Sequence, residues 1–400
     1  MEMTILPHRL SGAMTILPSK SQAHRLLICA AFAREETRIL CGETNEDMDA
    51  TVECLRALGA DIRADEGGYA VTPVRTPPKQ ARLDCRESGS TLRFLLPVVG
   101  ALGVDATFRL AGRLPNRPLS PLWEEMNRMG CTLSRPTPDT VRCQGRLQSG
   151  TYALSGGVSS QFITGLLLAL PLLDGTSRIR ILGRLESRPY VELTLQTMAR
   201  FGVFASTDRI PGGRPYRSPG TVRVEGDWSN AAFFLAAEAL GSPVQVSGLS
   251  PDSVQGDQAA AVLLPQLRDG CCRISAADIP DLVPVLAVAA GASRGAVFTE
   301  IGRLRLKESD RVASVVNMIR SLGGIAFASR TTLTVLGTGF RGGTVDAARD
   351  HRIAMAAAVA ATVCREPVTV RGAEAVAKSY PRFWEVYQQL GGILHEQHLR

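Results

Sequence analysis

Amphipathic helices that end at a glycine recur along this chain at a nearly constant spacing. In each of them, apolar residues stand three or four positions apart, and a glycine follows where a left-handed residue often terminates a helix. Successive glycines of this series are 71, 72, 68, 53 and 68 residues apart. The helix before Gly270 is weaker because Pro265 interrupts it. Such a period predicts repeated structural units, and the terminating glycines are Gly59, Gly130, Gly202, Gly270, Gly323 and Gly391.

A second series of helices alternates with the first. These segments are nearly uncharged and rich in Ala, Leu and Val, and their starts are 70, 70, 69, 53 and 69 residues apart. The starts lie near Lys20, Ser90, Ser160, Ser229, Leu282 and His351. We therefore interpret the chain as six copies of one unit. Each would hold a buried helix, an amphipathic helix and short strands, such as 221–224 and 333–336.

Helices that are apolar on all sides belong in a core. One such helix per unit predicts an α/β fold in which helices pack together inside and sheets form the outer walls. At 400 residues the chain is long for a single core. We therefore expect two domains of three units each, divided near Glu225 after the Gly/Pro-rich stretch 211–220, which we interpret as a mobile loop.

Charge and composition narrow the class of ligand. The net charge of +7 and the pI near 9.1 fit either nucleic acid or small polyanions. Basic runs with interleaved aromatics are absent and aromatics make up only 5% of the chain, so we favour a pocket for small polyanions and expect no nucleic-acid partner. The apolar run 166–173 is too short to span a bilayer, so we expect no membrane partner. The first residues lack the pattern of a signal or transit peptide.

The nine cysteines indicate the compartment rather than a metal site. They form no CxxC pair, and none stands at metal-binding spacing from two histidines, so we expect no metal ion. Most lie in apolar segments, which is typical of reduced, buried thiols in a cytoplasmic protein.

Cations stand at the starts of several buried helices. Ser19 is a candidate N-cap, which places Lys20 and Ser21 in the first turn of a helix. A cation there opposes the helix dipole by about 0.3–1 kcal/mol, so Lys20 makes more sense if an anion meets it. Arg93 and Arg352 occupy comparable positions. Several such helix starts directed into one cleft would bind anions strongly.

Other polar residues near the helix starts have simpler explanations. Capping alone explains Asp227 and Ser229. The basic segment 303–311 is typical of a solvated connection between a strand and a helix. With Arg113, Arg117 and Lys378, however, the cations suffice for two phosphorylated or carboxylated ligands.

Taken together, these motifs resemble the 5-enolpyruvylshikimate-3-phosphate (EPSP) synthase family over nearly the whole chain. Among them are Lys-Ser-Gln-Ala-His-Arg at 20–25, Ser-Ser-Gln at 159–161, Lys-Glu-Ser-Asp-Arg at 307–311 and Asp-His-Arg at 350–352. Further matching segments are 88–93, 117–119, 187–190, 225–227 and 378–381, together with Asp281.

The resemblance implies a two-domain inside-out α/β barrel of six βαβαββ units, three per domain, that closes over its substrates. It implies an N-terminal domain over 19–224 and a C-terminal domain of 1–18 with 225–400. It also implies a monomer that needs no cofactor.

The implied reaction moves the carboxyvinyl group of phosphoenolpyruvate to the 5-hydroxyl of shikimate 3-phosphate and releases inorganic phosphate. The hydroxyl must lose a proton while the enol CH₂ gains one. The two substrates together carry about six negative charges, which matches the density of cations in this sequence.

The resemblance also implies residue roles. Asp281 would be the base on the 5-hydroxyl, and Glu308 the acid at the methylene with Lys20 as helper. Burial would raise the pKa of Glu308 whereas Lys307 and Arg311 would lower it, and the sequence leaves both outcomes open. The residues implied for shikimate 3-phosphate are Lys20, Ser21, Arg25, Ser159, Ser160, Gln161, Ser187, Asp281 and Lys307. Those implied for phosphoenolpyruvate are Lys20, Gly89, Arg117, Gln161, Arg311, Arg352 and Lys378.

Two positions depart from the family pattern. Arg303 stands where some members have Asn, which leaves its role open. The second helix start reads Glu-Ser-Gly-Ser-Thr-Leu-Arg at 87–93, where several bacterial members have Asn-Ala-Gly-Thr-Ala-Met-Arg. By resemblance, Ser90 and Phe94 flank the phosphoenolpyruvate pocket, so this difference leaves sensitivity to glyphosate open. We expect Gly89→Ala to weaken glyphosate more than phosphoenolpyruvate.

Two alternatives remain at this point. UDP-N-acetylglucosamine enolpyruvyl transferases share the architecture and the donor, but they typically have Lys-Asn where this chain has Lys20-Ser21, and a Cys-bearing loop where 113–118 has none. A basic nucleic-acid-binding protein fits the pI but would need stacking aromatics on a basic face.

Overall fold

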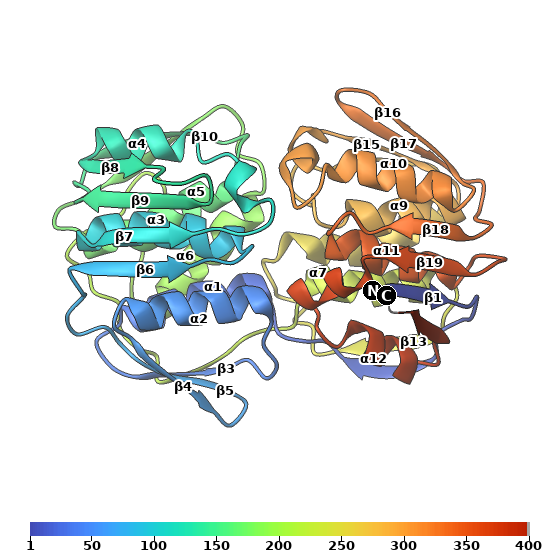
Figure 1. Ribbon diagram of the computed structural model, residues 1–400, viewed down its shortest axis with the longest axis horizontal. Helices are drawn as coiled ribbons and strands as arrows, with labels where there is room; N and C mark the ends of the chain where they lie inside the picture. Colours follow the sequence, from blue (N-terminus) through green and yellow to red (C-terminus); the bar gives the residue numbers. More distant parts are fainter. Residues whose placement is uncertain (398–400) are drawn as a thin grey trace. The chain divides into compact units, whose positions relative to one another are not determined.

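The computed structural model describes residues 1–397, and the chain divides into two compact units. One consists of Met1–Leu17 with the segment that begins at Gly226, and the other of Pro18–Glu225. We call them the terminal unit and the central unit. Figure 1 shows the central unit in blue to green and the terminal unit in yellow to red, with the blue N-terminal strand β1 inside the latter. Among residues 1–397, no helix has the length and apolar character needed to cross a membrane.

The central unit contains a helical core and three sheets. Its helices are α1 (Lys20–Ala31), α2 (Glu46–Ala57), α3 (Gly89–Leu102), α4 (Leu122–Arg128), α5 (Ser160–Ala169) and α6 (Arg188–Arg200). Its strands are β3 (Thr37–Leu40), β4 (Asp61–Asp65), β5 (Gly68–Thr72), β6 (Gln80–Asp84), β7 (Asp105–Arg109), β8 (Cys131–Ser134), β9 (Thr140–Gly145), β10 (Thr151–Ser155), β11 (Arg178–Leu182) and β12 (Thr221–Arg223).

The terminal unit has a matching set of elements. Its helices are α7 (Trp228–Ala239), α8 (Ala260–Asp269), α9 (Val283–Ala292), α10 (Arg311–Ser321), α11 (His351–Ala361) and α12 (Phe383–Gln389). Its strands are β1 (Glu2–Ile5), β2 (Gly12–Thr15), β13 (Val244–Ser247), β14 (Cys272–Ser275), β15 (Ala296–Thr299), β16 (Ile325–Ala328), β17 (Thr332–Leu336), β18 (Gly343–Asp346), β19 (Val368–Arg371) and β20 (Leu394–Gln397).

One βαβαββ pattern recurs in both units. In the central unit, β6, α3, β7, α4, β8 and β9 follow one another and form a sheet in the order β6-β7-β9-β8. In the terminal unit, β14 to β17 form a sheet in the equivalent order β14-β15-β17-β16. The sheet β18-β19-β1-β20 has the same plan, but the N-terminal strand β1 occupies the third position, between β19 and β20, which β9 occupies between β7 and β8. The expected repeat is thus visible in the strand pairing.

Two repeats are shorter, and one of them explains the irregular spacing in the sequence. The sheets β10-β11 and β13-β2 each consist of two parallel strands. After α8 ends at Asp269, β14 begins directly at Cys272, so no hairpin separates them. This missing hairpin shortens the gap to 53 residues. Gly270 accordingly has an extended backbone, with φ of −169°, whereas Gly59, Gly130, Gly202, Gly323 and Gly391 have φ between +76° and +105°.

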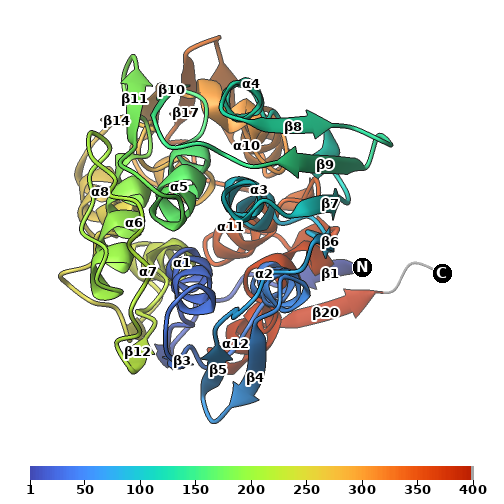
Figure 2. The ribbon, with the colours of Figure 1, turned by 90° about the vertical axis from the view of Figure 1, so that its left-hand side faces the viewer.

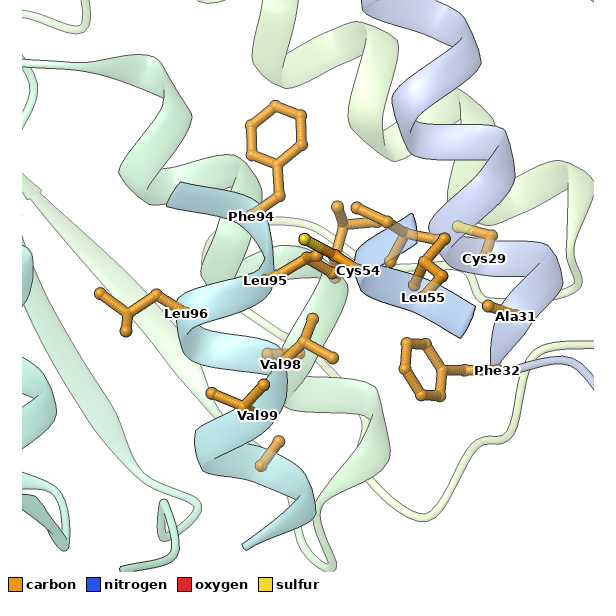
Figure 3. Packing of buried hydrophobic residues seen from close by; sticks show 14 of the residues in the cluster. Cys29, Ala31, Phe32, Cys54, Leu55, Phe94, Leu95, Leu96, Val98 and Val99 are labelled. Carbon is orange, nitrogen blue, oxygen red and sulfur yellow. The ribbon is translucent and has the colours of Figure 1, made fainter. Parts of the chain in front are cut away.

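The helices form the core of each unit. In the central unit, α2 contacts both α1 and α3, and α5 contacts both α3 and α1; Figure 2 shows these four helices side by side. Figure 3 shows Cys54 and Leu55 of α2 among apolar side chains of α1 and α3. Strands such as β5 alternate between buried and partly exposed residues, so one sheet face covers the helices. The mixed α/β class is therefore confirmed, but the described sheets remain open and do not close into a barrel.

The stretch 211–220 differs from the expected mobile loop. It contains neither a helix nor a regular strand, but Tyr216 is fully buried and donates its hydroxyl to the carbonyl of Leu168 at 3.0 Å. The segment therefore packs against the core of the central unit. The thiols follow the expectation of burial except at Cys271 and Cys272, which are exposed and partly exposed.

Candidate active site

The start of α1 places Lys20 beside an acidic residue that the sequence did not single out. Ser19 caps the helix, with its side chain accepting a hydrogen bond from the N–H of Gln22. Lys20 Nζ lies 2.9 Å from Oδ2 of Asp47, in the first turn of α2, and both side chains are largely buried. The cation at this helix start therefore has an internal anionic partner. No sequence motif links residues 27 positions apart in this way.

Arg25, one turn further along α1, forms hydrogen bonds to residues of α1, α5 and α6. Its side chain donates to Thr194 Oγ1 at 2.8 Å, Thr164 Oγ1 at 3.3 Å and the carbonyl of Tyr190 at 3.1 Å, and it also bonds the carbonyl of Ser21. Burial lowers the pKa of Arg25 to about 10, so it remains protonated at neutral pH. These four bonds leave one of its five N–H groups for a ligand.

The starts of α3 and α5 meet around Gly89, the first residue of α3. Arg93 Nη1 donates to Gln161 Oε1 at 2.7 Å, and Gln161 Nε2 donates to Ser90 Oγ at 3.0 Å. A methyl group added at Gly89 would lie 2.8 Å from Nη1 of Arg93 and 2.9 Å from Nη1 of Arg117. Two guanidinium groups thus lie directly against the glycine, which only a residue without a side chain allows.

Three serines stand at the starts of α5 and α6. Ser159 caps α5 by accepting from the N–H of Gln161 at 3.3 Å, and Ser160 is buried. Ser187 is buried and precedes α6 with a left-handed backbone, at φ 56° and ψ 39°. Such a conformation costs a non-glycine residue roughly 1–3 kcal/mol and often marks a functional position.

In the terminal unit, the Asp281 carboxylate lies among three cations. Oδ1 is 2.7 Å from Nη1 of Arg311 and 3.4 Å from Nζ of Lys307, and Oδ2 is 3.0 Å from Nη2 of Arg352. Burial alone would raise the pKa of Asp281, but the charges of Arg352, Lys307 and Arg311 together hold it well below its usual range. Asp281 is therefore an ionised carboxylate that can accept a proton.

Arg311 binds two further carboxylates besides that of Asp281. Its side chain is fully buried, and it donates to Glu308 Oε2 at 2.8 Å and to Asp350 Oδ2 at 3.0 Å. A guanidinium so close to Glu308 favours the ionised carboxylate. Asp350 also caps α11 by accepting from the N–H of Arg352 at 3.1 Å. The sequence placed Asp350 at a helix start but gave no sign of its ion pair with Arg311.

Lys307 is the most readily titrated cation of this group. Burial lowers its pKa to about 8; Asp281 opposes this shift, while the charges of Arg311 and Arg303 add to it. The positive charge of Arg303, which stands where some family members have Asn, therefore helps to lower the pKa of Lys307. Figure 1 shows α9, α10 and α11 in the same unit, and each of the three contacts the other two.

Ser229 and Asp257 join this cluster, which corrects one prediction. Asp227 caps α7, as predicted, by accepting from the N–H of Asn230 at 2.8 Å. Ser229 does not cap, because its hydroxyl donates to Asp257 Oδ2 and accepts from Arg352 Nη2 at 3.4 Å. Burial and then the charge of Asp281 raise the pKa of Asp257 to about 6, although Arg352 opposes them. Nothing in the sequence pointed to Asp257.

The remaining expected ligand, Lys378, ends the short helix η5 (Ala373–Lys378), which packs against α11. Within residues 1–397, no group of three or more His, Cys, Asp or Glu side chains is arranged to hold a metal ion. The cations and carboxylates described above can provide anion binding and proton transfer.

In the terminal unit, the carboxylates of Asp281, Glu308 and Asp350 pair with Lys307, Arg311 and Arg352. An anionic ligand at these three cations would therefore compete with carboxylates.

Comparisons with known proteins identify the family. The EPSP synthase (3-phosphoshikimate 1-carboxyvinyltransferase) family model matches residues 6–387. This chain belongs to the EPSP synthase family. Relatives named 3-phosphoshikimate 1-carboxyvinyltransferase, from Clostridium kluyveri and Clostridium beijerinckii, are 37% and 36% identical to it over 98% of both chains.

Solved structures show the same fold. An EPSP synthase from Acinetobacter baumannii superposes with a TM-score of 0.80 at 22% identity, covering 99% of this chain and 100% of that one. The enolpyruvyl transferase NikO from Streptomyces tendae superposes with a TM-score of 0.77 at 18% identity, covering 100% and 99%. The predicted family is confirmed. The EPSP synthase family consists of transferases of the shikimate pathway, which move the enolpyruvyl group of phosphoenolpyruvate to shikimate 3-phosphate.

Proposed function

We propose that this chain catalyses the EPSP synthase reaction with residues from both units. The observation that carries the proposal is the 36–37% identity to 3-phosphoshikimate 1-carboxyvinyltransferases over 98% of both chains. The reaction joins the 5-oxygen of shikimate 3-phosphate to C2 of phosphoenolpyruvate and places a proton on the CH₂ group. Loss of phosphate from this tetrahedral adduct, with loss of a proton from the new methyl group, restores the double bond.

The central unit would supply most of the contacts to shikimate 3-phosphate. We assign its 3-phosphate to Ser159, Ser160 and Ser187, together with Lys307 of the terminal unit. Lys20, Ser21 and the remaining N–H of Arg25 would bind nearer the shikimate ring. The strained backbone of Ser187 and the helix N-terminus at Ser160 support this assignment.

Phosphoenolpyruvate would bind to cations from both units. In the central unit these are Lys20 and Arg117, with Gln161 and the backbone at Gly89. The close approach of Arg117 to Gly89 supports this assignment. In the terminal unit we assign Arg311, Arg352 and Lys378.

Asp281 would remove the proton of the 5-hydroxyl. In the absence of substrate, its carboxylate forms ion pairs with Arg311, Arg352 and Lys307. A phosphate or carboxylate that takes over one of these cations also brings negative charge near Asp281, and both effects raise its pKa. Substrate binding would therefore make Asp281 a stronger base when the hydroxyl is in place.

Glu308 would protonate the methylene with help from Lys20. Its pair with Arg311 opposes this role in the free protein because it favours the ionised form. Phosphoenolpyruvate bound to Arg311 would weaken that pair and raise the pKa of Glu308. A single substrate contact at Arg311 would thus raise the pKa of both the proposed acid, Glu308, and the proposed base, Asp281.

Further proposals complete this picture. We propose that the chain acts as a cytoplasmic monomer, that it adopts the family's inside-out arrangement of six repeats, and that domains 19–224 and 1–18 with 225–400 close over the substrates.

Phosphate release from the purified protein tests the proposed function. With phosphoenolpyruvate and shikimate 3-phosphate together, we expect one phosphate per acceptor consumed, and none with either substrate alone. Release with UDP-N-acetylglucosamine in place of shikimate 3-phosphate would overturn the assignment in favour of the related transferase.

A further inference from the structure

Helices α1 and α2 of the central unit are joined by two polar contacts, one helical turn apart. Lys20 Nζ lies 2.9 Å from Asp47 Oδ2. One turn later, Nδ1 of His24 lies 2.7 Å from Oγ1 of Thr51. Residues four apart share a helix face, so the contact of Lys20 with Asp47 and the contact of His24 with Thr51 form two adjacent rungs between α1 and α2.

The second rung continues into α3. Thr51 Oγ1 lies 2.7 Å from Thr91 Oγ1, and Thr91 donates its hydroxyl to Ser88 Oγ at 2.8 Å. Ser88 caps α3 and immediately precedes Gly89. A continuous chain of hydrogen bonds thus runs from α1 through α2 to the start of α3.

All four side chains of this chain are buried. His24, Thr51, Thr91 and Ser88 each have a relative exposure of 0%. The rings of His24 and Phe94 are nearly perpendicular, with their centroids 6.3 Å apart. A polar group left unpaired in such surroundings costs far more than one that can reach water. The hydrogen bonds that join these four side chains are therefore costly to break.

Hydrogen counting fixes the direction of the chain. Each hydroxyl has one proton, and Thr91 donates its proton to Ser88 Oγ at 2.8 Å, with the carbonyl of Asp47 as a longer second acceptor at 3.4 Å. The proton of Thr51 must then go to Thr91, so Thr51 accepts from His24. The Nδ1 atom of His24 therefore carries a hydrogen. Burial lowers the pKa of His24 to about 3, with Lys20 and Arg25 adding to the shift and Asp47 opposing it, so the ring is neutral at neutral pH.

We propose that Thr51 and Thr91, with His24 in its Nδ1–H tautomer, are positioning residues that hold Gly89 at a fixed place relative to Lys20. The proposal rests on the proposed function, in which Lys20 and the backbone at Gly89 bind phosphoenolpyruvate. The serines assigned to the 3-phosphate stand at the starts of α5 and α6, outside this hydrogen-bond chain. Loss of the Thr51 hydroxyl should therefore affect phosphoenolpyruvate more than shikimate 3-phosphate.

Thr51→Val tests this role because it keeps the shape of the side chain and removes only the hydroxyl. We expect KM for phosphoenolpyruvate to rise about tenfold, and KM for shikimate 3-phosphate to change less than about twofold. Thr51→Ser restores the hydroxyl and should return KM for phosphoenolpyruvate to near the unsubstituted value.

Thr197→Val provides a matched control. Thr197 is also buried on a helix of the central unit, and its hydroxyl donates at 2.8 Å to the carbonyl of Leu193. This variant should lower the unfolding temperature without changing either KM. Equal changes of both KM values in Thr51→Val, or an unchanged KM for phosphoenolpyruvate, would overturn the proposal.

The tautomer of His24 gives a readout that needs no turnover. Nitrogen-15 NMR of the five histidines, with His24→Gln to assign the signal, should show a neutral ring protonated at Nδ1 between pH 6 and 8. A hydrogen at Nε2 in the unsubstituted protein would overturn the proposal even if Thr51→Val does not fold. A protein without turnover but with the Nδ1–H tautomer would refute the proposed function and leave the hydrogen-bond chain standing.

Discussion

Asp281 and Arg311 form the closest ion pair of the terminal cluster, with Oδ1 2.7 Å from Nη1. The same guanidinium also binds Glu308 and Asp350. Both proposed proton-transfer groups therefore depend on one cation, which the assigned phosphoenolpyruvate site would share. This arrangement links the protonation of Asp281 and Glu308 to the arrival of substrate, because an anion at Arg311 weakens both pairs together.

The lowered pKa of Lys307 predicts an alkaline limb in the pH profile. Lys307 carries its charge below a pKa of about 8 and loses it as the pH rises further. The value of kcat/KM for shikimate 3-phosphate should therefore fall above pH 8, approaching about tenfold per pH unit. In Lys307→Arg the cation stays charged, so the limb should move beyond pH 10. An unchanged limb in this variant would assign the titration to another group.

Gly89→Ala should weaken binding of phosphoenolpyruvate. The added methyl group would lie within 3 Å of both Arg93 and Arg117, so at least one guanidinium must move. We expect KM for phosphoenolpyruvate to rise about tenfold or more. Glyphosate, which has one more chain atom between its phosphorus and its carboxylate, should lose more affinity than the substrate.

Gly270→Ala is the control for that substitution. Its methyl group would meet nothing within 4 Å, and its backbone is extended. Steady-state kinetics with glyphosate as inhibitor should show no change in this variant. Equal losses of phosphoenolpyruvate and glyphosate in Gly89→Ala would contradict the predicted selectivity.

Two substitutions of Ser187 separate its effect on stability from its effect on ligand binding. Its left-handed backbone suits glycine, so Ser187→Gly should be more stable than Ser187→Ala by about 1 kcal/mol. Both variants lack the hydroxyl and should bind shikimate 3-phosphate more weakly to a similar degree. Chemical unfolding and calorimetric titration measure the two effects separately. An alanine variant with unchanged affinity would remove Ser187 from the phosphate site.

The fully buried pair of Arg311 and Asp350 should matter for stability far more than an exposed pair. Asp350→Ala removes the acceptor of the buried Nε of Arg311 and the cap of α11, so we expect a loss of about 3–5 kcal/mol in unfolding free energy. Glu366→Ala breaks the exposed pair with Arg341, also 3.0 Å long, and should cost no more than about 1 kcal/mol. Comparable losses in urea unfolding would contradict the assigned role of burial.

The sequence predicts those parts of the fold that depend on local signals. Ser19 caps α1 and Gly59 follows α2 with a positive φ because capping and helix termination involve only neighbouring residues. Strand pairing was not predictable in this way. The N-terminal strand β1 pairs with β19 and β20, nearly 400 residues away, and no local pattern encodes such a partner.

The same distinction applies to the candidate site. Lys20 and Asp281 stand in recognisable motifs, whereas their partners come from other helices. Asp47 pairs with Lys20 from α2, and Asp257 reaches the cluster through Ser229. These pairs form only when several helices pack together, so the sequence alone does not reveal them.

Asp281→Ala removes the proposed base and takes one carboxylate away from Lys307, Arg311 and Arg352. Turnover and shikimate 3-phosphate affinity should be measured on the same preparation, by phosphate release and by calorimetric titration. We expect phosphate release to be abolished while the affinity for shikimate 3-phosphate stays equal or becomes tighter, since Asp281 no longer competes for Lys307. Loss of binding together with turnover, or turnover that persists, would contradict the assignment of Asp281 as the base.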